Sequence, residues 1–332
     1  MGHATGIDSL MTKKLLGALF DAVHHGKFDF NDFMYGRMEE NYDVIAVGRP
    51  DHRRKIFRPN KKLKTYHIFL KAFVIEYLPI NGDVVFSYRK GFSAYDAVAK
   101  HARSKYFFQT DISSFFASID RSLVKKTILA AKDDCPVLDI ECSIERLLDL
   151  MCIDDSLPIG FPASAPISNA ILFDFDNAFS QFCKTRDLIF TRYSDDIVVS
   201  SDAKVRMSGL EQEITKQLQS SASEKFRLNS SKSRYFQVGG RIKILGMMIL
   251  PNGKITIDSK LKNDIEVLLF HYINDKGSFI ELVKGDEESG LDKLTGYLNY
   301  ANSIDSNYLA KLRRKFGATT IDILMHRALA KK

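Results

Sequence analysis

Pairs of adjacent aspartates are the residues of this 332-residue sequence best suited to chemistry. The pairs at 133–134 and 154–155 lie in polar connectors near prolines, where solvated turns are expected. Asp195-Asp196 differs, because it stands between two apolar runs, LIFTRY and IVVSS, that predict a β-hairpin. Two neighbouring anions are costly to bury there unless a cation compensates them. A hard divalent metal is the natural compensation, because Mg²⁺ prefers carboxylate oxygens and substrate phosphates.

Asp111 adds a third carboxylate, because it ends another apolar strand pattern, YFFQTD at 106–111. If this strand lies beside the hairpin, Asp111 and Asp195 face the same point in space. Two Mg²⁺ ions about 3.5–4 Å apart could then activate a primer 3′-hydroxyl and stabilise a leaving pyrophosphate. The pattern by itself leaves an equal alternative, in which the aspartates are helix caps and turn residues.

The elements that must position these residues alternate in type along the chain. Strands are also expected at RRKIFRP (53–59) and in the hairpin-like 241–257, and the connector to about residue 41 carries no predicted element. Helical spacing is expected over 7–24, 63–78, 113–131, 170–184 and about 207–226, and from about 259 onward. A Pro/Gly/Ala/Ser loop, LPIGFPASAPISN at 157–169, opens the helix at 170. This order predicts an α+β core, a small sheet with helices on one face, beside a helical C-terminal lobe.

The net charge of +7 is unevenly placed. Eight basic residues face one acid between Arg49 and Lys64, and seven face one between Lys311 and Lys332. Two separated basic stretches suit a polyanion held from two sides, although two solvated faces explain the charge equally well. No apolar run reaches membrane-spanning length and no secretory pattern opens the chain. The four cysteines lack zinc or disulfide spacing, so a cytoplasmic protein is expected.

An ordered set of motifs over about 42–315 resembles the reverse transcriptases. YSDD (193–196) resembles their Y-x-D-D box, and DISSFF (111–116) resembles their first catalytic motif. The 157–169 loop is similar to the bacterial and retron-type pattern L-P-Q-G-x-P-x-S-P-x-x-S-N, and RLNSSKS carries L-N-x-x-K. RKIFRP resembles the fingers motif, LGMMIL the primer-grip hairpin and LDKLTGYLNYA a thumb segment. Y-x-D-D alone would be weak, but the ordered set is specific.

The resemblance implies a right-hand polymerase. It implies an N-terminal helical extension at 1–41, fingers at 42–104, a palm with fingers–palm connecting helices at 105–250, and a helical thumb at 251–332. The implied activity is RNA-directed DNA polymerisation, which adds dNTPs to a primer 3′-hydroxyl with two Mg²⁺ ions, for which Mn²⁺ could substitute. Implied partners are an RNA template or non-coding RNA, the DNA product, and a second copy or an accessory defence protein. No membrane partner is expected.

Residue roles follow from the same resemblance. Asp111 and Asp195 correspond to the metal-bridging ligands, Asp196 assists one metal, and Ile112 is counted with the metal site. Lys232 corresponds to the lysine that protonates the departing pyrophosphate as a general acid. The other expected contacts are to the nucleotide (Arg54, Arg58, Phe116, Ile159, Gly160 and Ser164) and to the primer (Tyr193, Leu245 and Gly246).

Most of these residues also have simpler interpretations. Phe116 falls at the family's sugar-gate position, where an aromatic ring excludes a 2′-hydroxyl by clash, but core packing is the alternative. Lys232 alone would be a solubility charge, Tyr193 a packed aromatic and the two arginines a solvated strand edge. The glycine and serine of the 157–169 loop could serve an ordinary turn. Leu245-Gly246 could be a strand with a glycine bulge.

Several positions depart from the family pattern. Ile159 replaces a glutamine, Ala165 replaces a proline, and only His101 remains of the retron signature N-A-x-x-H. The retron V-T-G motif is replaced by 244–246, ILG. These departures favour a stand-alone phage-defence or abortive-infection enzyme over a true retron enzyme, a role that rests on family analogy. The alternatives are a catalytically silent nucleic-acid-binding scaffold and a template-independent DNA polymerase; Phe116 and YSDD disfavour a viral-type RNA polymerase.

Overall fold

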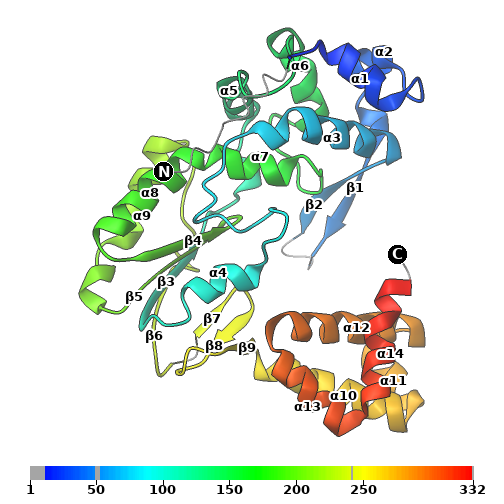
Figure 1. Ribbon diagram of the computed structural model, residues 1–332, viewed down its shortest axis with the longest axis vertical. Coiled ribbons are helices and arrows are strands. Elements are labelled where there is room, and N and C mark those ends of the chain that lie inside the picture. Colours follow the sequence, from blue (N-terminus) through cyan, green and yellow to red (C-terminus); the bar gives the residue numbers. More distant parts are fainter. Residues whose placement is uncertain (1–11, 49–52, 241, 331–332) are drawn as a thin grey trace, which may run out of the picture.

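The computed structural model describes residues 12–48, 53–240 and 242–330. It confirms the predicted α+β class, with small antiparallel sheets packed against helices and a group of helices at the C-terminal end (Figure 1). None of the helices in these ranges combines the length and the apolar character needed to cross a bilayer.

A four-stranded antiparallel sheet forms the centre, in the order β4-β5-β3-β6. Its strands are β3 (Tyr106–Asp111), β4 (Ile189–Tyr193), β5 (Asp196–Ser201) and β6 (Arg234–Gln237). The strand predicted from YFFQTD and the hairpin predicted around Asp195-Asp196 are both confirmed. β3 lies beside β5, so the condition on which the three-aspartate hypothesis depended is met.

Both faces of this sheet are covered. Successive residues of a strand point to opposite faces, and neighbouring residues of β3 and of β5 pack into different hydrophobic clusters. Phe108 and Val199 belong to the larger hydrophobic cluster, together with residues of every helix before residue 222 except α4. Phe107 and Val198 belong to a second cluster, which includes Val98 and strands β7–β9. The expectation of helices on one face is therefore incomplete, since the other face packs into a cluster that contains a further sheet.

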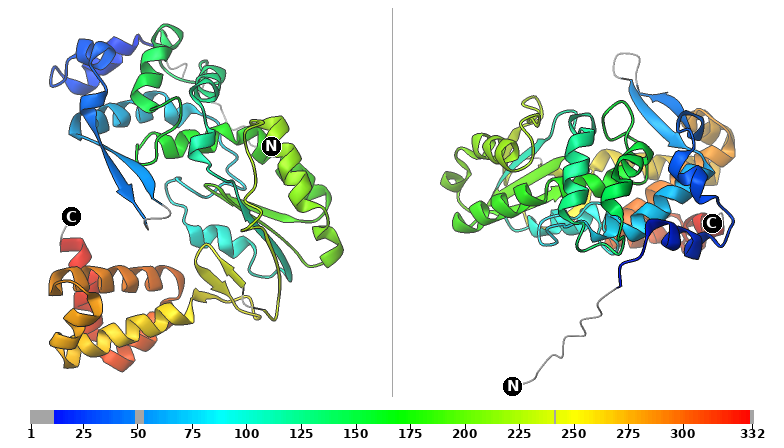
Figure 2. Two further views of the ribbon diagram at one scale, coloured as in Figure 1. Left: turned by 180° about the vertical axis from the view of Figure 1, so that it is seen from behind. Right: turned by 90° about the horizontal axis from the view of Figure 1, so that it is seen from above.

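The structure also contains two smaller sheets. The first pairs β1 (Tyr42–Val47) with β2 (Arg54–Pro59), which confirms the strand predicted from RKIFRP, and Figure 2 shows this hairpin projecting from the body. The second contains β7 (Ile242–Ile244), β8 (Met247–Ile249) and β9 (Ile255–Ile257). In Figure 1 this second sheet lies between the central sheet and the C-terminal helices.

The helices fall into two groups. Those before the small C-terminal sheet are α1 (Leu16–His24), α2 (Phe30–Tyr35), α3 (Lys61–Phe73), α4 (Ala94–Lys100), α5 (Arg121–Ala130), α6 (Ile140–Met151), α7 (Ser164–Ile171), α8 (Phe173–Thr185) and α9 (Leu210–Ser221). Those after it are α10 (Ser259–Asn274), α11 (Lys276–Val283), α12 (Glu287–Ile304), α13 (Ser306–Phe316) and α14 (Ala318–Ala330). Short 3₁₀ turns occur at η1 (Glu39–Asn41), η2 (Ile75–Tyr77), η3 (Phe116–Ser118) and η4 (Lys204–Met207).

Two predicted helix starts are corrected, and one helix was not predicted. The helix expected over 7–24 begins at Leu16, because Lys14 pairs as an extended residue with the 136–138 segment; residues 7–11 lie outside the described residues. The connector up to residue 41 contains α2, which the Asp29 side chain caps at Asn31 N–H, 2.9 Å. The helix expected over 113–131 begins at residue 121, where an aspartate cap replaces the expected serine caps.

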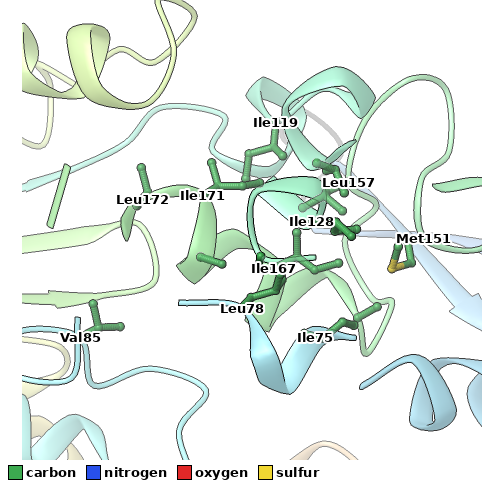
Figure 3. Close-up of a cluster of buried hydrophobic side chains, with 14 of the residues drawn as sticks. Ile75, Leu78, Val85, Ile119, Ile128, Met151, Leu157, Ile167, Ile171 and Leu172 are labelled. Carbon is green, nitrogen blue, oxygen red and sulfur yellow. The ribbon is translucent and has the colours of Figure 1, made fainter. Parts of the chain in front are cut away.

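The loop predicted at 157–169 already contains a helix, α7, which the larger hydrophobic cluster anchors (Figure 3). The helix expected over 170–184 is α8, which begins at Phe173 after a break at Leu172. Ile167 and Ile171 of α7 are both buried, as is Ile128 of α5. Burying one such side chain stabilises the fold by about 1.5–3 kcal/mol. The apolar residues of the loop motif therefore anchor α7, and with it the loop, in the larger hydrophobic cluster.

His101, the residue retained from the retron signature, is a structural histidine. It is fully buried, its Nδ1 lies 2.6 Å from Ser200 Oγ, and its Nε2 lies 2.7 Å from Thr191 Oγ1. Thr191 belongs to β4 and Ser200 to β5, so the imidazole links the two strands of the hairpin. Burial lowers the pKa of His101 to about 3, and the ring is therefore neutral at physiological pH.

This lowered pKa makes the fold sensitive to acid. Below pH 6.5 the unfolded chain takes up a proton that folded His101 excludes, so the free energy of unfolding falls by about 1.4 kcal/mol for each pH unit. We expect His101→Gln to remove this contribution. Denaturant unfolding at pH 7.5, 6.0 and 5.0 should then show a shallower loss of stability in the variant than in the wild type. Parallel losses would contradict the assignment.

Candidate active site

The three predicted aspartates meet at one end of the central sheet. Asp196 opens β5 and is paired across the ladder with Asp111, the last residue of β3. Asp195 lies in the turn of the β4-β5 hairpin, and its carbonyl accepts a hydrogen bond from Ile112 N–H at 3.1 Å. The aspartates at 133–134 and 154–155 lie in exposed turns, as expected.

Lys232 reaches this group from the segment that follows α9. Asn229 N–H donates to the main-chain carbonyl of Asp111 at 2.9 Å, so the L-N-x-x-K segment runs alongside the end of β3. The Lys232 Nζ then lies 2.8 Å from Asp111 Oδ2. The lysine side chain is 57% exposed, which leaves the ammonium group accessible to a bound substrate.

The site carries more negative charge than the protein compensates. Asp111 is only 6% exposed, and within the described residues its buried Oδ1 has no hydrogen-bond partner. Burial, and after it the charges of Asp195 and Asp111, raise the pKa of Asp196 to about 6, although Lys232 opposes the rise. A carboxylate oxygen without a partner and a carboxyl group whose pKa is raised are both features of a site that fits a bound cation.

The donor set fits a divalent metal that is shared with a substrate. Over the described ranges, no three His, Cys, Asp or Glu side chains enclose a metal position by themselves. Mg²⁺ in phosphoryl-transfer sites is held by one or two carboxylates and takes its remaining ligands from water and substrate phosphates. Asp111 Oδ1 and the carboxylates of Asp195 and Asp196 suit that partial shell. Ile112 is buried beside them, and its predicted place in the metal site stays a prediction.

A cavity of about 640 Å³ extends from Asp196 and Lys232 to the predicted primer-grip turn. Asp196 and Lys232 line it together with Leu245 and Gly246, and Arg234 and Lys243 add positive charge. Leu245 (φ 47°) and Gly246 (φ 82°) form the two-residue turn between β7 and β8. The alternative of a strand with a bulge is therefore wrong, and the turn faces the same space as Asp196.

A second group of predicted residues lies on the β1–β2 hairpin and the 157–163 loop. Ile159 carbonyl accepts a hydrogen bond from Phe57 N–H at 2.8 Å, and its side chain is 37% exposed. Gly160 has φ 107°, and a Cβ there would lie 2.5 Å from Phe57 carbonyl oxygen, so no other residue fits. Arg54 and Arg58 are exposed on the adjoining strand, β2.

Ser164 and Phe116 are placed differently from each other. Ser164 is buried and its hydroxyl donates to Pro158 carbonyl at 2.7 Å, so it shapes the loop, and direct contact with a nucleotide stays a prediction. Phe115 fills the core position of the FF pair, 3% exposed. Phe116 is half-buried next to it and offers part of its ring to the surface. Tyr193 is half-buried at the end of β4.

Sequence patterns did not predict a set of buried polar residues between α8 and the β4-β5 hairpin. An ion pair between Arg192 of β4 and Asp176 of α8 lies at its centre. Both side chains are fully buried. A signal was available, because each charged residue interrupts an otherwise apolar pattern. Their pairing could not be read from the sequence, since it depends on how α8 packs on β4.

Comparison with known families agrees with this geometry. The family model described as "Reverse transcriptase (RNA-dependent DNA polymerase)" matches residues 49–249, which is more than half of the chain. The chain belongs to the reverse transcriptase family. It is therefore an RNA-directed DNA polymerase by family, and the matched range contains all three aspartates and Lys232.

The curated relatives of this reverse transcriptase include retron enzymes. It is 28% identical over 272 residues to the retron Ec73 reverse transcriptase of Escherichia coli, covering 79% of this chain and 83% of the relative. It is 24% identical over 302 residues to the Escherichia coli retron Ec83 enzyme, covering 85% and 92%. A Candida tropicalis telomerase in complex with a telomeric RNA fragment is similar at a TM-score of 0.48 and 12% identity, covering 83% and 55%, a level that carries no further argument.

The raised pKa of Asp196 predicts how metal binding depends on pH. Because a protonated carboxyl group is a poor metal ligand, Mn²⁺ affinity should fall by roughly tenfold for each pH unit below about 6. Electron paramagnetic resonance can measure free Mn²⁺ against the protein between pH 5.0 and 7.5. Asp196→Asn should bind more weakly and with a shallower pH dependence; equal slopes would show that another group controls binding.

Proposed function

We propose that this reverse transcriptase extends a DNA primer by adding dNTPs to its 3′-hydroxyl, with Asp111, Asp195 and Asp196 as the catalytic carboxylates. The observation that carries the proposal is the pairing of Asp111 with Asp196 beside the turn that holds Asp195. The buried Oδ1 of Asp111, which has no hydrogen-bond partner in the described part of the chain, supports it, because buried carboxylate oxygens with a purely structural role are hydrogen-bonded.

Two Mg²⁺ ions, or Mn²⁺ in their place, would supply the Lewis-acid chemistry that activates the primer hydroxyl and neutralises the leaving pyrophosphate. Asp111, Asp195 and Asp196 would hold them, with Ile112 beside them. Lys232 already directs its ammonium group into the same site and carries protons that it can donate. It is therefore suited to protonate the pyrophosphate oxygen as that group departs.

The remaining residues are proposed to orient the substrates. Leu245 and Gly246 line the cavity that contains Asp196, which supports a primer contact there. Tyr193, at the end of β4, is proposed as a further primer contact. Arg54 and Arg58 are exposed next to the 157–163 loop, where they are available to a triphosphate. The half-buried ring of Phe116 is proposed to exclude the 2′-hydroxyl of a ribonucleotide.

The biological setting is proposed from the relatives. Because the curated relatives include retron reverse transcriptases, we propose that the template is a non-coding RNA and that the enzyme acts in antiphage defence in the cytoplasm. The departures at Ile159, Ala165 and in the retron signature occur in a chain that resembles retron enzymes over most of its length. A second copy or an accessory protein is proposed as a further partner.

Removing the charge of the hairpin aspartates tests the proposal. Asp195→Asn with Asp196→Asn should abolish dNTP incorporation, because the amides cannot hold a divalent cation, while the thermal midpoint stays the same or rises as repulsion is relieved. The matched control is Asp133→Asn with Asp134→Asn, the same change at an exposed pair. Primer extension and thermal melting measure both. Extension by the 195/196 variant at near the wild-type rate would contradict the proposal.

Sugar selection gives a second test. Phe116→Ala should raise the incorporation of ribonucleotides relative to deoxynucleotides, because the clash with the 2′-hydroxyl is removed. Single-turnover rates with each dNTP and its rNTP measure the ratio, and Phe116→Tyr, which keeps the ring, is the control. If Phe116→Ala polymerises with an unchanged ratio, the ring only packs.

Ile159 gives a third test, because its exposed side chain offers an apolar surface where the motif that the 157–169 loop resembles has a glutamine, which could form a hydrogen bond. Losing one such bond weakens nucleotide selection by about 0.5–1.5 kcal/mol. We therefore expect wild-type products on a heteropolymeric RNA to be restricted, biased or partly untemplated, and Ile159→Gln to be more accurate. Sequencing the products, with Ile159→Val as the control, decides it. Long, accurate wild-type copies that Ile159→Gln does not improve would refute this expectation.

A further inference from the structure

Ser194, the residue before Asp195, is held by the protein at all its polar groups. Its backbone is left-handed, with φ 60°, a conformation that costs free energy for a residue other than glycine. Its N–H donates to Ser87 Oγ at 2.8 Å, and its carbonyl accepts from Arg192 Nη1 at 2.9 Å. Its hydroxyl oxygen accepts from Tyr88 Oη at 3.0 Å. The orientation of the turn is therefore set from outside the turn.

The donor to the Ser194 carbonyl is itself fixed. Arg192 Nε and Nη2 donate to the two carboxylate oxygens of Asp176 at 2.7 and 2.6 Å, a bidentate pair in which both side chains are fully buried. Arg192 Nη1 and Nη2 also donate to the side-chain and main-chain oxygens of Asn169, at 3.0 and 3.3 Å. The guanidinium plane has no freedom to rotate without breaking several of these bonds.

The acceptor for the Ser194 N–H is fixed in the same way. Ser87 is fully buried; its hydroxyl donates to Asn169 Oδ1 at 3.2 Å, and its carbonyl accepts from Asn169 Nδ2 at 2.9 Å. Asn169 is therefore hydrogen-bonded to both residues that bind the Ser194 backbone, Ser87 and Arg192. The connected residues come from four places in the chain: the segment before α4, and α7, α8 and β4.

Fold stability alone does not explain this arrangement. Replacing a buried ion pair by apolar residues of similar volume is often neutral or stabilising, so a core at this place has no need of charge. A polar network can, however, hold one backbone conformation that apolar packing would leave variable. Metal ligands need such support, because small displacements of a carboxylate weaken binding.

We propose that Ser87, Asn169, Asp176 and Arg192 are positioning residues, which direct the Asp195 carboxylate to the metal by holding Ser194. The inference rests on the proposed function of Asp195. It assigns to these four residues an effect on metal affinity and on turnover that acts through the turn and involves no contact with the substrate.

Ser87→Ala is the primary test, because it removes the acceptor for Ser194 N–H without leaving a buried charge. Loss of a residue that orients a metal ligand typically weakens metal affinity or turnover by about ten- to a hundredfold. We expect a change of that size in kcat and in the Mn²⁺ dissociation constant measured by electron paramagnetic resonance without nucleic acid, with little change in KM for dNTP.

The matched control is Ser104→Ala. Ser104 is also a buried serine and its hydroxyl bonds to Ser200 Oγ at 2.8 Å, at the other end of β5 from Asp196. It should lower the thermal midpoint about as much as Ser87→Ala and leave Mn²⁺ affinity unchanged. If both variants bind Mn²⁺ as the wild type does, the positioning role is overturned while the proposed function stands. A wild type that neither binds Mn²⁺ nor extends a primer overturns both.

A second variant separates positioning from stability. Arg192→Met with Asp176→Leu replaces the pair by apolar side chains of similar size and leaves no buried charge unpaired, so a folded protein is expected even though the oxygens of Asn169 and the Ser194 carbonyl lose a donor. Its kcat and Mn²⁺ affinity should nevertheless fall as in Ser87→Ala, because the Ser194 carbonyl loses its donor. A stable double variant with wild-type kcat and Mn²⁺ affinity would overturn the inference.

Discussion

The antiparallel pairing of β3 with β5 is the constraint on which the rest of the site depends. It places Asp111 directly across from Asp196 and brings Asp195 to the adjoining turn. A slip of one residue in this register would send Asp111 to the opposite face of the sheet. Buried side chains on both faces prevent the slip, since Phe107 and Phe108 belong to different hydrophobic clusters.

This register concentrates negative charge at the end of a sheet that is otherwise apolar. Lys232, an accessible lysine, forms an ion pair with Asp111 Oδ2. The buried Oδ1 of Asp111 is left without a hydrogen-bond partner among the described residues. Such an arrangement costs stability in the absence of a cation, a common feature of sites selected for function. The Arg192–Asp176 pair is fully buried, and Arg192 donates a hydrogen bond to the Ser194 carbonyl in the turn. Because the two charges neutralise each other, the pair adds no net charge to the aspartate site.

Sequence patterns predicted the elements that carry the chemistry, because short apolar runs that end at aspartates leave few alternatives. The same patterns missed α2, which depends on the cap at Asp29, and α7, which begins where Ser164 closes the loop on Pro158. Long-range relations were out of reach: Ser87 meets Ser194 across 107 positions, and no periodicity encodes that contact. The roles of Arg54, Arg58 and Phe116 stay predictions, because they depend on substrates.

The most direct measurement is a crystal structure of the protein with primer, template, a non-hydrolysable dNTP and Mn²⁺, with the metal located by anomalous scattering. We expect Mn²⁺ within ligand distance of Asp111 Oδ1 and of the Asp195 carboxylate, with the triphosphate completing the shell. Bound substrates with Mn²⁺ elsewhere, or with Asp111 Oδ1 hydrogen-bonded to protein, would contradict it.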